Sequence, residues 1–454
     1  MSNFSALLSS ASIYAQAFKS ADVTSREMRM AIPAWFDLYF ADNSTKTEDP
    51  CQRIPYTVVR KLTKTVFSEY TATSTDKFAE AILDALAERA PAAMQMALIG
   101  GESLLKPIPS INGIRFTVIP RYNVLVFGRD AEGNMADIGT VEKTAQGRHY
   151  YTLLERRTVD ENGYLTIRNR LYQSYTKDSL GQAVPLNSLP QYADLQEEYT
   201  FTKPIGSIGL ISLKTPMVNC VDGSEDSVSV YAAAEGLIHN INRNEAQLSG
   251  EFDRGESRII VSSDMLEKGK DGKAKLTDNV FVGLDENQET TGVTIFSPAL
   301  REASFLARKQ EYLRNVENVI GLKRGLLSEV EAAERTATEI TSSAGEYNLT
   351  IIDFQRMWEV TVKETMRVCG ILGQLYRVTG AHEIADDAVV INWGNGVLYD
   401  EAKTDQELRA QVQAGLLQPE RYLGWYYNLP CGTEEERKKI REQYMPVALE
   451  EGAE

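Results

Sequence analysis

The stretch from Val228 to Val378 places the strongest constraint on how this chain can fold. It contains two helix-length segments, Val228 to Arg254 and Ala299 to Ile320, separated by an insert of β-like composition that runs to Phe296. A short loop follows, and then the longest helical pattern in the chain, from Thr336 to Val378. At about 1.5 Å per residue the first helix alone would be roughly 40 Å long. Two such rods with a β insert at their far end do not describe a single compact enzyme core.

Apolar residues mark one narrow face on each of these helices. Steps of three and four residues keep the apolar positions on one side of a helix. The faces consist of Ala234, Ile238, Ile241, Leu248 and Phe252 on the first helix, Leu306, Leu313, Val316 and Ile320 on the second, and Tyr347, Ile351, Phe354, Trp358, Val362, Met366, Cys369, Leu372 and Tyr376 on the third. Narrow stripes on the two rods are typical of packing against neighbouring helices, which predicts a protein that works beside copies of itself.

The flanking segments indicate a mixed α+β fold. Helices are expected over residues 56–70, 77–89, 91–101, 401–414, from Pro419, and over 434–443, and strands over 113–128, 149–159, 164–173 and 389–393. The pair Asn162-Gly163 between two β-rich runs is the strongest hairpin signal in the chain. Thr75-Asp76 is expected to cap the helix that follows it, and Ser227 to cap the first rod.

The charge balance is acidic. With 48 Lys and Arg against 64 Asp and Glu, the formal net charge is −16. Cationic side chains supply most of the affinity of proteins for nucleic acid, so a monomer of this charge should not grip a phosphate backbone. It could still surround nucleic acid without holding it, although an acidic balance is also ordinary for a soluble cytoplasmic protein.

The residue patterns of known catalytic and metal sites are missing. The four cysteines, Cys51, Cys220, Cys369 and Cys431, form no CxxC pair and are interpreted as free thiols in a reducing compartment. The histidines His149, His239 and His382 lie far apart, and the chain has no HExxH, phosphate-binding loop or GxSxG motif. Trp35, Trp358, Trp393 and Trp425 are interpreted as core residues. No signal peptide or membrane span is expected, and the sequence predicts a structural protein that is not an enzyme and needs no cofactor.

Six short segments, in this order and spread over most of the chain, carry a family resemblance. They are Ala97 to Glu102 with Leu105 to Pro107, Leu154-Glu155 with Ile167 to Tyr172, Lys214 to Asn219, Gly255 to Val261, Thr336 to Ile340, and Val412 to Leu417. Together they resemble the portal proteins of tailed bacteriophages, specifically the compact siphovirus-type group. The first fifty and the final ten residues match least.

The resemblance implies a multi-domain portal fold. Its parts would be an α/β wing (1–227) that also takes in the long helix and a strand (336–398), a two-helix stem (228–254 and 299–320), a small β-rich clip (255–298), a tunnel loop (321–335) and a helical crown (399–454). Such proteins form a ring of about twelve subunits at one capsid vertex. Double-stranded DNA passes through the ring during packaging and ejection. The terminase motor docks on the clip, head-completion or adaptor and tail proteins later take its place, and capsid and scaffolding proteins surround it.

The resemblance also implies the residues of two sites. Mixed charges in the tunnel loop would line the DNA channel, namely Lys323, Arg324, Glu329, Glu331, Glu334 and Arg335. The cations among them would touch phosphate, or else the charges would form salt bridges between subunits; both interpretations stay open. Lysines of a turn in the clip would contact docking proteins, namely Lys268, Lys270, Lys273 and Lys275. The protein would be assembled in the bacterial host cytoplasm, become part of the virion, and have no membrane contact.

Two other classes of function remain open on the sequence. One is a different phage structural component, an adaptor or a scaffold, but such proteins lack two rods that carry an insert. The other is an enzyme with an unrecognised site, which metal-dependent or nucleotide turnover by the purified protein would reveal.

Overall fold

The computed structural model describes most of the chain and divides it into two compact units. The described residues are 14–15, 17–40, 50–255, 299–329, 337–385, 387–394, 401–427 and 429–445, with four short strands between residues 258 and 296. The first unit comprises Met1–Lys64 and Thr73–Val389, and the second Thr65–Ala72 and Val390–Glu454. Helices and antiparallel sheets occur together in the chain, which confirms the expected α+β class.

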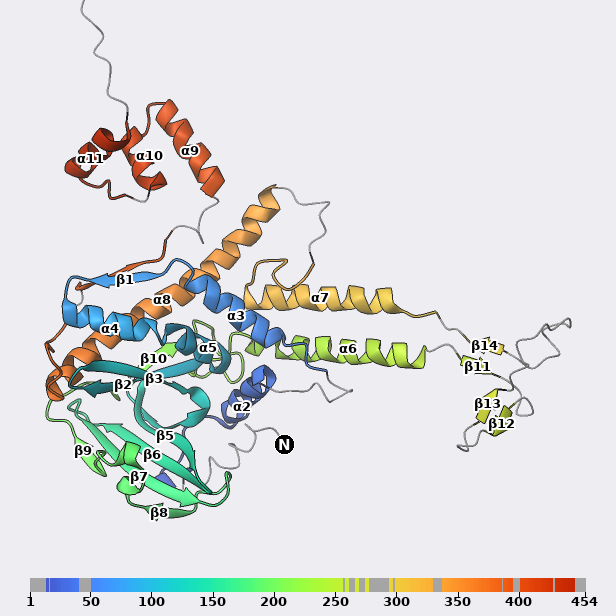
Figure 1. Cartoon of the computed structure of the whole chain (residues 1–454), viewed down its shortest axis with the longest axis horizontal. Coiled ribbons are helices and arrows are strands. Elements are labelled where there is room, and N and C mark those ends of the chain that lie inside the picture. The colour runs from blue at the N-terminus through green and yellow to red at the C-terminus, as the bar shows by residue number, and fades with distance from the viewer. Residues whose placement is uncertain are drawn as a thin grey trace, which may run out of the picture. The chain divides into compact units, whose positions relative to one another are not determined.

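Three helices of the first unit pack against a three-stranded antiparallel sheet (Figure 1). The sheet has the order β10-β2-β3, and its helices are α4, α5 and α8. These elements span Glu102–Ser110 (β2), Gly113–Pro120 (β3), Ile211–Lys214 (β10), Lys77–Ala87 (α4), Ala90–Gly100 (α5) and Ala337–Leu375 (α8). Asp76 caps α4 by accepting hydrogen bonds from the backbone N–H groups of Phe78 and Ala79, as the sequence predicted.

Large side chains from distant parts of the sequence fill the core of this unit. Trp35 and Phe36 on α2 (Arg26–Phe40) and Trp358 and Phe354 on α8 are almost completely buried. The hydroxyl of the buried Tyr231 donates a hydrogen bond to the carbonyl of Trp35 at 2.8 Å. The apolar stripe predicted on the long helix is therefore a core face, and it is buried from Tyr347 to Leu372; Tyr376, beyond the end of α8, is half exposed instead.

A six-stranded antiparallel sheet forms the second layer of strands in this unit. Its order is β4-β5-β6-β7-β8, and β9 also pairs with β7. The strands are Val124–Arg129 (β4), Met135–Gln146 (β5), His149–Val159 (β6), Leu165–Ser174 (β7), Gln182–Val184 (β8) and Glu198–Thr200 (β9). The turn between β6 and β7 closes through a hydrogen bond from the N–H of Asp160 to the carbonyl of Tyr164, with Gly163 at φ 80°. This confirms the hairpin predicted at Asn162-Gly163.

The two predicted rods are α6 (Glu235–Arg254) and α7 (Glu302–Ile320), which pack side by side (Figure 1). Both begin later than the sequence predicted. The N–H of Val230 and the hydroxyl of Ser229 donate hydrogen bonds to the carbonyl of Leu98, so residues 228–231 pack against the end of α5 and leave the helical path. Ser227 therefore does not cap α6, whose N-cap is Ala234.

The insert between the rods contains four short strands, as the β-like composition predicted. Arg258–Ile260 (β11) pairs with Thr294–Phe296 (β14), and Leu266–Lys268 (β12) pairs with Ala274–Leu276 (β13); both pairs are antiparallel.

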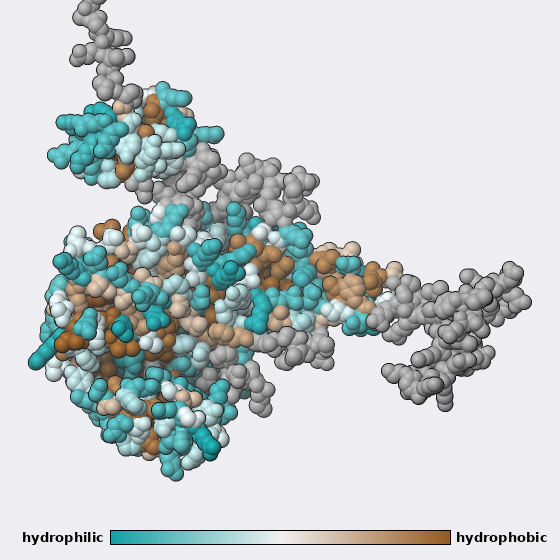
Figure 2. Space-filling view, in the orientation of Figure 1, coloured by the Kyte–Doolittle hydropathy of each residue, from teal (hydrophilic) through white to brown (hydrophobic). Residues whose placement is uncertain are grey.

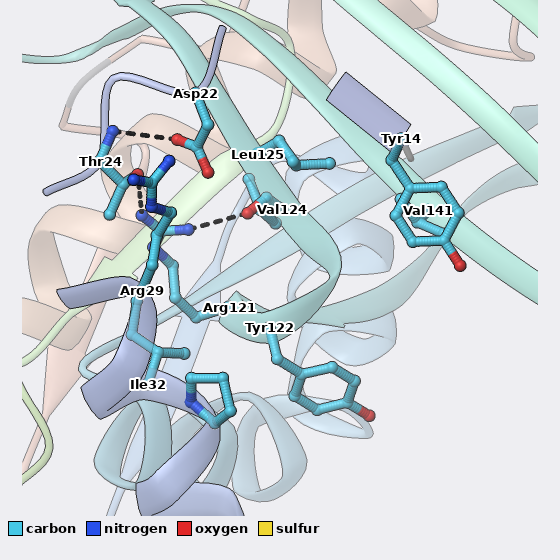
Figure 3. Close-up of a pocket in the computed structure, with 11 residues that line it drawn as sticks. Tyr14, Asp22, Thr24, Arg29, Ile32, Arg121, Tyr122, Val124, Leu125 and Val141 are labelled. Atoms are coloured by element: carbon cyan, nitrogen blue, oxygen red, sulfur yellow. Dashed lines mark hydrogen bonds between the residues drawn. The ribbon is translucent and has the colours of Figure 1, made fainter. Parts of the chain in front are cut away.

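The strand predicted over residues 113–128 is interrupted, and a buried arginine lies at the interruption. The chain makes a 3-10 turn (η1, Arg121–Asn123) between β3 and β4. The Arg121 guanidinium is 4% exposed and donates to the carbonyl of Val124 at 2.9 Å and to the hydroxyl of Thr24 at 3.3 Å (Figure 3). It also lies 3.5 Å from the Asp226 carboxylate. The cavity of about 60 Å³ beside it is a small packing defect around a satisfied charge.

The second unit is mainly helical. It contains α9 (Glu401–Gln413), α10 (Pro419–Tyr426) and α11 (Glu434–Tyr444), close to the helices predicted there. Thr433 and Glu436 form a capping box at the start of α11. The strands β1 (Thr71–Ser74) and β15 (Val389–Asn392), whose residues span the boundaries of the units, pair in a two-stranded sheet.

Gly101 lies so close to the backbone of Ser227 that no other residue type fits at this position. Its φ is 83°, and a Cβ atom there would lie 2.2 Å from the carbonyl oxygen of Ser227. We expect Gly101→Ala to lower the free energy of unfolding by at least about 2 kcal/mol, because strain in the backbone adds to a clash with another backbone segment. Urea unfolding followed by tryptophan fluorescence measures the loss.

Gly147→Ala is the matched control for this substitution. Gly147 also has a positive φ, 62°, but a Cβ atom there would meet nothing within 4 Å. It should cost only the strain of the left-handed backbone, about 1 kcal/mol. Equal losses in the two variants would show that the approach of Ser227 contributes nothing.

Candidate functional site

The loop that follows α7 is the candidate functional site, and its first residue is fixed by geometry. Gly321 ends α7 in the left-handed conformation, with φ 77°. The N–H of Leu322 then donates to the carbonyl of Glu317 at 2.8 Å, which closes the helix end. A Cβ atom on residue 321 would lie 2.7 Å from the hydroxyl oxygen of Thr350 on α8. That hydroxyl also donates to the Gly321 carbonyl at 3.2 Å. The glycine therefore lets the loop start in contact with the long helix.

A buried carboxylate holds the described part of the loop, residues 322–329. Glu317 of α7 has no exposed surface. Its two oxygens accept hydrogen bonds from the backbone N–H groups of Gly325, Leu327 and Ser328 and from the Ser328 hydroxyl, at 2.5 to 3.2 Å. No ion pair to Glu317 occurs among the described residues. Burial of a carboxylate is costly unless it is hydrogen-bonded, so these four donors fix the loop around Glu317.

Two further contacts tie the loop to neighbouring helices. The ammonium group of Lys61, on α3 (Ile54–Val66), donates to the carbonyl of Leu326. The N–H of Glu329 donates to the side-chain oxygen of Gln310 on α7 at 2.8 Å. Leu322 and Ser328 are buried. The loop is thus held by α3, α7 and α8 together, and the turn between its buried ends projects outward.

The structure places half of the loop residues singled out by the sequence. Lys323, Arg324 and Glu329 are all exposed, and none of them forms an ion pair within the described residues. Glu331, Glu334 and Arg335 lie outside the described residues. An exposed pair of adjacent cations at the tip of an anchored loop is free to meet a charged ligand or another subunit.

The four lysines singled out in the insert are only partly placed. Lys268 lies on β12 and Lys275 on the paired strand β13. Lys270 and Lys273 lie outside the described residues. Their role as docking residues stays a prediction.

Sequence reasoning missed Glu317, the residue that organises the loop. A signal was present, because Glu317 interrupts the apolar face formed by Leu313, Val316 and Ile320 on α7. A carboxylate on a buried helix face, just before a glycine-bounded loop, is placed to accept backbone N–H groups.

No alternative catalytic centre emerges from the described residues. They contain no group of three or more His, Cys, Asp and Glu side chains placed to hold a metal ion. The histidines are apart: His382 pairs with Asp76 at 2.6 Å, His239 lies 3.8 Å from Glu235, and the His149 ring contacts the Tyr175 ring at a tilt of 48°. Within the same residues, no helix has both the length and the apolar character that crossing a bilayer requires.

Comparison with known proteins places the chain in a family. Among solved structures, a chain titled "Neck of native GTA particle computed with C12 symmetry" is similar, with 14% identity and a TM-score of 0.44 over 93% of this chain and 99% of that one; this likeness is too distant to support an argument. No curated protein matches the chain. The family description "Phage portal protein, SPP1 Gp6-like" matches residues 135–444. Because this match covers more than half of the 454 residues, the chain belongs to the SPP1 Gp6-like family of phage portal proteins.

Proposed function

We propose that the protein forms a ring at one capsid vertex, with about twelve copies around a channel for double-stranded DNA. In this assignment residues 228–254 and 299–320, which contain α6 and α7, are the stem, residues 255–298 the clip, 321–335 the tunnel loop, 399–454 the crown, and residues 1–227 and 336–398 the wing. The ring is a structural channel of the virion and head-tail connector, and DNA enters through it during packaging and leaves through it during ejection.

The apolar surface of the two stem helices is the observation that carries the proposal. Phe252, Leu306 and Val319 are 44%, 44% and 49% exposed, although α6 and α7 already pack against each other. Figure 2 shows brown, hydrophobic surface over these two helices. Exposed apolar side chains on a pair of helices favour burial against a partner. Copies of the same hairpin arranged around an axis supply that partner.

The loop and the net charge support a passage for DNA. The loop is anchored at Glu317 and exposes Lys323 and Arg324. A ring of chains that each carry a net charge of −16 repels phosphate overall, so two cations per subunit give weak contacts without a tight grip. DNA that must slide through the ring needs weak contacts of this kind, because tight binding would stall its movement.

Docking partners follow from the same assignment. In the sequence, the clip lies between α6 and α7. It would bind the terminase motor during packaging, and head-completion, adaptor or tail proteins afterwards. Major capsid and scaffolding proteins would contact the wing. Binding of purified terminase to a variant with residues 269–275 replaced by a short linker tests the clip assignment.

Leu306→Asp tests the ring itself. The side chain is half exposed on α7, so the substitution should leave the subunit folded, while a carboxylate on an apolar subunit contact should prevent assembly. Mass photometry is expected to find rings for the natural protein and a species of 50.6 kDa for the variant.

Ile111→Asp is the matched control, because Ile111 is 70% exposed in the turn between β2 and β3, away from the stem. It should assemble normally. A natural protein that remains monomeric at high concentration would contradict the proposed function, and normal rings from Leu306→Asp would remove the stem from the interface.

A further inference from the structure

A groove in the first unit has an apolar floor and an acidic rim, and none of the roles proposed above involves it. It has a volume of about 990 Å³ and lies between the six-stranded sheet, the segment 206–214 and α8. Two hairpin turns of the sheet form one wall, residues 130–136 between β4 and β5 and residues 159–163 between β6 and β7. Residues 357–367 of α8 contribute to the opposite wall.

The floor of the groove is apolar. Leu104, Met135, Ile208 and Leu210 belong to one hydrophobic cluster and reach the groove from below. On α8, Val360 also lines the groove and is 59% exposed. This exposed valine beside an apolar floor favours a ligand with apolar side chains on one face.

The rim of the groove is acidic. Asp130, Glu132, Asp160 and Glu161 line it from the two turns, all four are exposed, and none of them is in an ion pair within the described residues. Two cations also line the groove, Lys214 and Arg367. The guanidinium of Arg367 is already committed to Glu364 at 2.6 Å and to the carbonyl of Ile205.

We propose that this groove binds a cationic amphipathic helix of another protein. The apolar face of such a helix lies on the floor and against Val360, and its lysines or arginines meet the four rim carboxylates. Apolar contact supplies affinity and the unpaired carboxylates supply selectivity for a cationic ligand. None of the residues that line this docking site belongs to α6 or α7.

The experiment uses the full chain and a defined probe, a fluorescent amphipathic peptide of leucine and lysine about 18 residues long. Anisotropy titration should find binding that weakens as salt rises, and at least about tenfold weaker binding of a peptide with glutamate in place of every lysine. Glu132→Lys combined with Glu161→Lys, and separately Val360→Asp, should each weaken binding of the lysine peptide by about tenfold. Glu132 and Glu161 are replaced, and the two aspartates are kept, because Asp130 and Asp160 also accept backbone hydrogen bonds within their turns.

Two control variants distinguish binding in the groove from a general effect of charge or of exposed apolar residues. Asp84→Lys with Glu88→Lys makes the same charge change on exposed positions of α4 and just after it, and Leu349→Asp changes another exposed apolar residue of α8. Both should bind the peptide as the natural protein does. Equal binding of the two peptides, equal affinity of groove and control variants, or a change of oligomeric state caused by the groove variants would overturn the proposal; the last result would assign the groove to a second copy of the chain.

Discussion

Replacing Glu317 with alanine is expected to release the loop that follows α7 and to slow or stall DNA packaging. The substitution leaves three backbone N–H groups and one hydroxyl without their acceptor in a buried site. A buried donor that loses its partner costs about 1–3 kcal/mol. Release of the loop lets solvent satisfy these groups and limits the total, so we expect a local loss of about 3 kcal/mol at this site.

Glutamine at position 317 provides a finer test of the same contacts. One carboxylate oxygen accepts from Leu327 and Ser328, and the other from Gly325 and the Ser328 hydroxyl. An amide replaces one acceptor with an NH2 donor, which must face at least one backbone N–H. Glu317→Gln should therefore weaken the loop by less than Glu317→Ala, by about 1–2 kcal/mol.

Hydrogen exchange of the amides of Gly325, Leu327 and Ser328 measures loop release directly. Their exchange should accelerate in both variants, while ring assembly persists. Glu311→Gln is the matched control, because its carboxylate lies on the same helix with a side-chain exposure of 63%. Unchanged exchange at the three amides would mean that Glu317 does not hold the loop, and normal packaging despite faster exchange would mean that a fixed loop is not needed for translocation.

The sequence predicted those elements whose signals are local. The cap at Asp76, the end of the helix predicted over residues 91–101 and the Asn162-Gly163 hairpin each depend on a few neighbouring residues, and all three were confirmed. The apolar face of α8 was also predicted, because a core stripe that continues over many turns is unambiguous.

The predictions that were wrong have a common cause, which is contact between segments distant in sequence. Residues 228–231 fit a helical pattern, but hydrogen bonds to Leu98 hold them in another path. The run from Gly113 to Gly128 has strand composition, yet the partners of the buried Arg121 come from residues 24 and 226 as well as from Val124. The partners of Glu317 are nearby in sequence, but its burial depends on how α7 packs. The acidic groove could not be predicted from the sequence, because its two turns and α8 come together only in the folded chain.

Replacing Glu155 with glutamine is expected to destabilise the first unit by about 3–5 kcal/mol near neutral pH, because it leaves a buried arginine and a partly buried lysine without their counter-charge. The Glu155 carboxylate, on β6, has 5% side-chain exposure and lies 2.5 Å from the Lys106 ammonium on β2 and 2.7 Å from the Arg157 guanidinium. Arg157 also donates to the carbonyl of Ile208 at 2.9 Å. This cluster joins the six-stranded sheet to the three-stranded sheet and to the segment beside the groove.

The same carboxylate predicts a dependence of stability on pH. Burial alone would raise the pKa of Glu155, but the charges of Arg157 and Lys106 outweigh burial and lower the pKa to about 2. The folded-state pKa is below the unfolded value of 4.5, so the stabilisation is fully present above pH 4.5 and is lost as pH falls toward 2. It amounts to about 3 kcal/mol. Urea unfolding at a series of pH values should therefore give a shallower acid-side decline for Glu155→Gln than for the natural protein.

Glu198→Gln is the matched control on the same sheet. Glu198 pairs with Arg168 at 2.9 Å, but the two side chains are 58% and 46% exposed, and solvent screens such a pair. Its loss should cost less than about 1 kcal/mol and leave the acid-side slope unchanged. If Glu155→Gln and Glu198→Gln destabilise the protein equally, or if the curves of Glu155→Gln and the natural protein stay parallel from pH 5 to pH 2, the buried cluster does not contribute as proposed. A difference in stability that is present above pH 4.5 and disappears as pH falls toward 2 would locate the stabilisation in the charge of Glu155, since the shape of the side chain is nearly the same in glutamine.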